Sequence, residues 1–125
     1  MDQRTNFITT LAIPLVALLS SSCSSAISDP VKLRAVKSEA RSLMAHYPTT
    51  PPDKWTNVSM SNWPPAIASL KPHSVTVFPW GLDILVRPYL DGGWGYQILR
   101  DGRSLPMPAN CYSELYQGVF WHGPC

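Results

Sequence analysis

Residues 73–99 read HSVTVFPWGLDILVRPYLDGGWGYQIL, and their alternation of apolar and polar side chains decides the fold. Val75 and Val77 alternate with Ser74, Thr76 and Phe78, which predicts a strand because successive strand residues point to opposite faces. Turn-forming residues at 79–81 and 91–93 divide the stretch into three segments of this kind. The predicted strands cover residues 74–78, 82–87 and 94–99.

The boundaries of the sheet follow from proline and glycine. Pro88 has no amide hydrogen, so the second strand is predicted to end there or to run along an edge. A brief strand is predicted to close at Pro106, and residues 118–121 are predicted to form the last strand.

Two helices are predicted before the sheet. Ser28, Asp29 and Pro30 form a helix start, and the apolar residues that follow at spacings of three and four predict a helix ending at Tyr47. Prolines in the first turn mark a short second helix over 62–70. The predicted fold class is α+β: two N-terminal helices, then a small antiparallel β-meander of three to five strands.

Composition limits the class of protein. The chain has 125 residues, enough for one small domain, and 45% of them are hydrophobic. Its net charge is only +2, and the sequence lacks the concentrated basic stripe of a nucleic-acid-binding protein, so no nucleic-acid partner is expected. Plentiful apolar residues and low net charge argue against intrinsic disorder.

The N-terminal segment is predicted to be a secretory signal peptide. Residues 7–19 are uncharged but number only thirteen, whereas a membrane-spanning helix needs about 20 apolar residues. Pro14 would also bend such a helix. The small residues of 20–26 follow, as expected of a cleavage region, although an uncleaved membrane anchor is a further alternative.

Residues 19–23, Leu-Ser-Ser-Ser-Cys, resemble the lipobox of bacterial lipoprotein precursors, and this resemblance covers only residues 1–23. The family's leucine three places before the cysteine is replaced here by Ser20, with Leu19 one place earlier. The resemblance implies cleavage before Cys23, which then carries diacylglycerol and an N-acyl chain such as palmitate. It divides the chain into a signal peptide (1–22), a lipidated N-terminus and linker (23–30) and one domain (31–125).

Localisation follows from the same residues. The residue after the cysteine, Ser24, is not the Asp that retains enteric lipoproteins in the inner membrane, which implies an outer-membrane lipoprotein. The alternative is cleavage after Ala26 and a soluble secreted or periplasmic protein.

The two remaining cysteines, Cys111 and Cys125, are predicted to form one disulfide because an exported protein meets an oxidising compartment. This bond would hold the C-terminus. The alternative, a metal site of Cys111, His122 and Cys125, lacks a fourth ligand, so no metal and no other cofactor is expected.

The sequence contains no recognised catalytic motif. It has no phosphate-binding glycine loop and no nucleophile elbow, so we expect a protein that is not an enzyme. Asp83 and Asp91 are a possible carboxylate pair, although turn chemistry explains the second of them. A small hydrolase relying on Asp83 or His122 is the least favoured alternative.

Aromatic residues are the remaining functional signal. Trp80 and Trp94 lie in or beside turns, where core packing is harder to arrange, and are the candidate partner contacts. The predicted function is a non-catalytic binding or accessory module of the cell envelope, whose partner is another envelope protein or a cell-wall polymer. The alternative is an inhibitor or immunity-type lipoprotein that blocks a hydrolase.

Overall fold

A six-stranded antiparallel sheet organises the computed structural model, which describes residues 26–47 and 54–125. The order of strands across the sheet is β1-β2-β3-β4-β6-β5. The predicted signal peptide and Cys23 lie outside the described residues. The strands are β1 (Thr56–Asn57), β2 (Ser74–Phe78), β3 (Gly81–Tyr89), β4 (Gly92–Leu99), β5 (Tyr112–Tyr116) and β6 (Val119–His122).

The sheet is a meander only as far as β4, which corrects the prediction. The β5–β6 hairpin folds back so that β6 pairs with β4 and β5 becomes an edge strand. Burial explains this order, because β6 contributes fully buried Val119 to the core whereas β5 has no buried residue. The sequence did not predict β1, which has only two residues, or β5. The brief strand predicted to close at Pro106 is wrong, because residues 100–106 form no strand.

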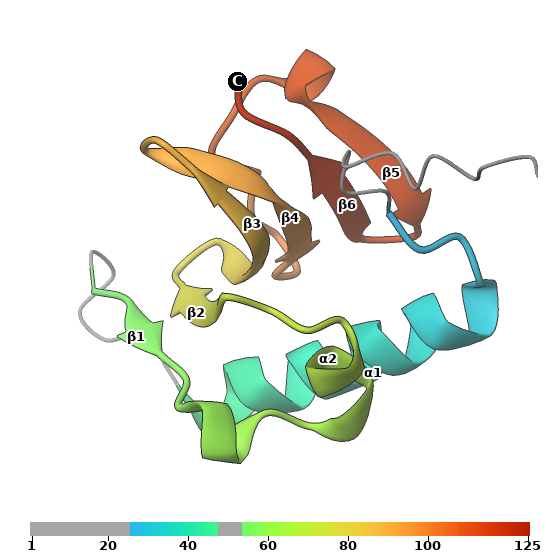
Figure 1. The fold of residues 1–125 in the computed structure, drawn as a ribbon, viewed down its shortest axis with the longest axis vertical. Coiled ribbons are helices and arrows are strands. Elements are labelled where there is room, and N and C mark those ends of the chain that lie inside the picture. The colour runs from blue at the N-terminus through green and yellow to red at the C-terminus, as the bar shows by residue number, and fades with distance from the viewer. Residues whose placement is uncertain (1–25, 48–53) are drawn as a thin grey trace, which may run out of the picture.

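Both helices lie on the same face of the sheet (Figure 1). Helix α1 (Pro30–His46) begins as predicted, because the side chain of Asp29 accepts a hydrogen bond from the Val31 amide at 3.0 Å. Its buried stripe matches the predicted spacing. That stripe comprises Leu33, Val36, Ala40, Leu43 and Met44.

Helix α2 (Pro65–Ser69) is shorter than predicted and follows β1, so the helices are not two consecutive N-terminal elements. A 3₁₀ turn at Met60–Asn62 takes up the start of the predicted helix. Glu39 of α1 satisfies the N-terminus of α2, accepting hydrogen bonds from the amides of Ala66 (3.0 Å) and Ile67 (2.9 Å). Five residues form too little helix to be stable alone, so this contact helps to define α2.

Alternation along the strands gives the sheet one apolar face and one face of mixed polar and apolar residues. The apolar face packs against the helices and contains the rows Val75–Ile84–Tyr96 and Val77–Leu82–Ile98. The opposite face, here called the open face, carries the residues between them. Its polar members include Thr76, Asp83, Gln97, Tyr112 and His122.

Strand β3 continues past Pro88, where the sequence predicted an end or an edge. The edge alternative holds locally, because the last β2 pairing joins Ser74 to Leu85 and residues 86–89 run beyond the end of β2. Residues 86–94 therefore form a two-stranded extension, here called the ribbon, which projects from the sheet (Figure 1). The ribbon turns at Leu90–Asp91, one residue before the predicted 91–93, and both following glycines belong to β4.

The predicted disulfide between Cys111 and Cys125 is present, with Cα atoms 5.9 Å apart. Because both sulfurs are bonded to each other, neither is free to bind the metal of the alternative site. Among the residues that the structure describes, no helix is long and apolar enough to cross a membrane.

Candidate functional site: a cavity on the open face

A cavity of about 480 Å³ lies over the open face, within the size range of small-molecule sites. Its polar floor consists of Asp83, Gln97 and His122 from three strands. The ribbon supplies one wall, and Pro106 and Met107, from the loop between β4 and β5, supply another. The apolar and aromatic wall residues are Phe78, Trp80, Leu85, Pro88, Leu90, Pro106 and Met107.

A chain of hydrogen bonds orders the floor. The Gln97 side-chain amide donates to Asp83 Oδ1 at 3.0 Å, and the Tyr112 hydroxyl donates to Gln97 Oε1 at 2.6 Å. The same Tyr112 hydroxyl accepts from the Met107 amide at 3.3 Å. Burial raises the pKa of Tyr112, with the Asp83 charge adding to this effect, so the hydroxyl stays protonated and able to donate at neutral pH. These hydrogen bonds therefore connect the loop that carries Met107 to the sheet.

His122 is the buried polar residue at the centre of the site, with 6% of its surface exposed. Its Nδ1 lies 3.1 Å from the carbonyl oxygen of Gly123, and its Nε2 lies 3.7 Å from Asp83 Oδ1. The second distance suits an ion pair but is too long for a hydrogen bond, so within the described residues Nε2 is buried without a hydrogen-bond partner.

Two opposing effects set the pKa of His122. Burial of the ring lowers the pKa, but the Asp83 carboxylate and the carbonyls of Gly123 and Gly93 together raise it above the ordinary value of 6.5. The proton is therefore held more tightly in the folded protein than in the unfolded chain. The protonated ring forms a buried ion pair with Asp83.

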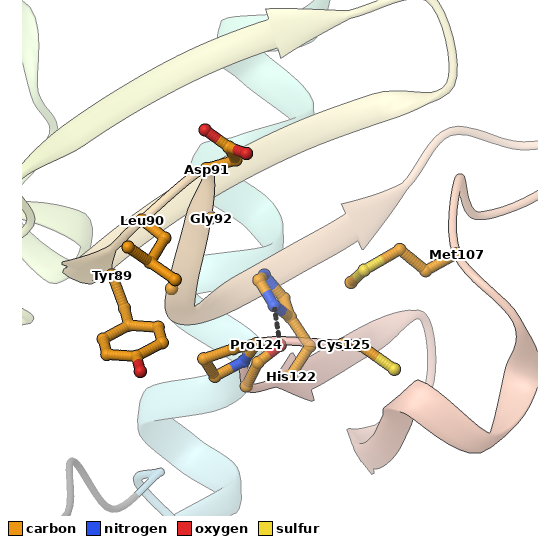
Figure 2. Close-up of a pocket in the computed structure, with 10 residues that line it drawn as sticks. Tyr89, Leu90, Asp91, Gly92, Met107, His122, Pro124 and Cys125 are labelled. Carbon is orange, nitrogen blue, oxygen red and sulfur yellow. Dashed lines mark hydrogen bonds between the residues drawn. The ribbon is translucent and has the colours of Figure 1, made fainter.

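A second cavity of about 310 Å³ shares residues with the first. Figure 2 shows the ribbon residues Tyr89, Leu90 and Asp91 on one side and Met107 on the other, with His122 between them. The C-terminal residues 123–125 complete its lining. Leu90, Asp91, Gly92, Met107 and His122 line both cavities. The ribbon tip therefore divides one concave region into two.

The structure separates the two tryptophans predicted to contact a partner. Trp80 is half-buried, stacks on Phe78 at 5.2 Å and lines the larger cavity. Trp94 alternates with buried Tyr96 and Ile98 and so lies on the apolar side of β4, beneath the Arg87 guanidinium at 5.0 Å. The two side chains do not share a surface, and their role as partner contacts stays a prediction.

Asp83 and His122 meet, whereas Asp91 lies on the exposed ribbon tip; all three line the larger cavity. Gln97, Tyr112 and Met107 also belong to the site but were not predicted from the sequence. Gln97 could have been identified from the sequence, because it is the polar residue between apolar neighbours in a central strand. Met107 could not have been identified in this way, since its position depends on how its loop folds over the sheet.

The described residues contain no cluster of three or more histidine, cysteine or acidic side chains that could hold a metal ion. Comparison of the chain with protein-family models, with curated proteins and with solved structures finds no match.

Proposed function

We propose that the protein is a non-catalytic binding module of the bacterial cell envelope, anchored by lipid on Cys23, which takes its ligand in the open-face cavity. The observation that carries this proposal is a cavity with aromatic and apolar walls above a hydrogen-bonded polar floor. Such sites combine apolar contact area with a few fixed polar groups that orient a ligand. The ligand is a group belonging to an envelope protein or to a cell-wall polymer.

The state of the polar side chains favours binding over hydrolysis. A general base must reach the proton that it removes, directly or through one water. His122 Nε2 is buried and faces Asp83, and Nδ1 faces a backbone carbonyl. Gln97 and Tyr112 are likewise engaged with other protein groups. These contacts support a preorganised floor rather than an acid–base pair aimed at a substrate.

The experiment compares three single tryptophan variants of the full chain. Immobilised protein is exposed to detergent-solubilised envelope and, separately, to enzymatically digested cell wall from the host, and retained components are quantified by mass spectrometry. Trp80→Ala removes a cavity wall and should reduce retention of the ligand at least tenfold. Trp55→Ala is the matched control, because Trp55 is 58% exposed and does not line the cavity.

The third variant, Trp94→Ala, tests the other predicted contact by itself. Loss of retention only in Trp94→Ala would move the site to the apolar side of the ribbon. Equal retention by all variants would contradict a role for the cavity. The inhibitor alternative gains support if the retained component is a hydrolase whose activity falls on binding.

A further inference from the structure

Leu90, at the ribbon tip, has a conformation and an exposure that do not favour the stability of the folded protein on its own. It is 89% exposed, and its backbone φ is 49°, in the left-handed region. Side chains with a Cβ disfavour this region, and two-residue hairpin loops usually place glycine or asparagine there. The leucine therefore strains the backbone and gains almost no burial, and strained backbone of this kind clusters at functional sites and ligand contacts.

The ribbon behind this leucine is built to be rigid. The Trp94 ring packs against Arg87 at 5.0 Å and against Tyr89 at 5.6 Å, and Pro88 fixes its own φ. Gly123 lies directly against the Trp94 indole, where an added Cβ would be 3.0 Å from Nε1. The Cys111–Cys125 disulfide anchors this C-terminal segment, and so supports the ribbon from below.

We infer that the ribbon tip is a preformed anchor whose Leu90 side chain inserts into an apolar pocket of a folded partner protein. This inference rests on the proposed function and specifies its partner as a protein. A projecting apolar side chain on a rigid support loses little conformational freedom on binding. Half-exposed Tyr89 adds aromatic contact area beside it, which is typical of the centre of a protein interface.

The chemistry of the tip favours a protein over a polysaccharide. An aliphatic side chain offers no hydrogen bond to sugar hydroxyls, whereas a folded protein can provide a dry pocket for it. Asp91 follows directly and is exposed, so the partner's pocket is expected to carry a Lys or Arg at its rim. The two cavities flank the tip, so the rim of the partner's pocket has room on either side of Leu90.

The test is site-specific photo-crosslinking of the full chain in its host. A photoreactive amino acid replaces Gly92, where an added Cβ meets no atom within 4 Å, so the probe sits beside the anchor without displacing structure. The expected result is one discrete protein adduct that falls at least tenfold in Leu90→Gly. Adducts that cell-wall hydrolases remove, adducts insensitive to Leu90, or no adduct at all would each overturn the inference.

Lys71 provides the matched control, because it is the other non-glycine residue in the described chain with positive φ, at 52°. Leu90→Gly and Lys71→Gly should both relieve backbone strain and raise the melting temperature by a few degrees. Only Leu90→Gly should abolish the adduct. Loss of the adduct in both variants, or a fall in melting temperature for Leu90→Gly, would indicate a structural role and contradict an anchor.

The outcome is separable from that of the proposed function. Trp80-dependent retention without a Leu90-dependent adduct would leave the cavity as the binding site and refute the anchor. A Leu90-dependent adduct that survives Trp80→Ala would confirm the anchor and place the partner on the ribbon rather than in the cavity.

Discussion

His122 on β6 approaches Asp83 on β3 across the strand that lies between them, with Nε2 3.7 Å from Oδ1. Gly95 is the β4 residue directly opposite His122, and it has no side chain to separate the two groups. The pair thus joins strands that are not neighbours, beneath the cavity. Because one member of the pair is a histidine, we expect the site to respond to pH.

Stability should depend on protonation of His122. Because folding raises its pKa above 6.5, the stabilisation is fully present below pH 6.5 and is lost as the pH rises through the folded-state value. Asp83→Asn removes the charge that favours the imidazolium, so the pKa of His122 should fall. Urea unfolding at about pH 5.5 and about pH 8 should then show a smaller difference than in the wild type.

The exposed His73 supplies the control for this experiment, since it lies outside the cavity lining. His73→Gln should retain the wild-type pH dependence. An unchanged pH dependence in Asp83→Asn, or a rise in the pKa of His122 by NMR titration, would contradict the ion pair.

The disulfide should contribute strongly to stability for so small a domain. Cys111 and Cys125 are separated by 14 residues, and closing a loop of this size stabilises the folded state by about 3 kcal/mol in the chain-entropy model. Reduction, or the Cys111→Ser/Cys125→Ser double variant, should lower the free energy of unfolding by about this amount. Denaturation with and without a reductant measures it, and equal stabilities would be inconsistent with the pairing.

Two adjacent ribbon glycines should respond oppositely to substitution. A Cβ at Gly93, whose φ is 145°, would overlap the Arg87 carbonyl oxygen, whereas one at Gly92 meets nothing within 4 Å. Gly93→Ala should therefore destabilise the fold by more than about 1 kcal/mol. Gly92→Ala should stay within about 0.5 kcal/mol of the wild type. Similar effects at both positions would mean that the ribbon is looser than described.

Local patterns predicted much of the fold. The start of α1, its buried stripe and the strands beginning near Val75, Leu82 and Trp94 follow from capping and periodicity. The order of β5 and β6 did not, because it depends on which strand of their hairpin buries more apolar surface. The turn shifted to Leu90 because the close approach of Gly93 to Arg87 places both glycines inside the ribbon.

The site was harder to predict from the sequence than the fold. Asp83, His122 and Trp80 were each singled out, yet nothing in their spacing showed that β4 would bring the first two together. Trp80 and Trp94 were grouped because both lie near turns, and only strand alternation in the folded sheet separates them. A site assembled from β3, β4, β6 and a loop can be predicted only once the strand order is known.

The most direct test of the central claim, binding in the open-face cavity, is ¹⁹F NMR of the full chain labelled with 5-fluorotryptophan. Each of its five tryptophans carries one fluorine label, single tryptophan variants assign the signals, and Trp63 and Trp121 report on the core. On addition of the solubilised envelope fraction, the account predicts that the Trp80 signal shifts or broadens while those of Trp55 and the two core tryptophans stay unchanged. A response at Trp55 without one at Trp80, or no response from any of the five, would contradict it.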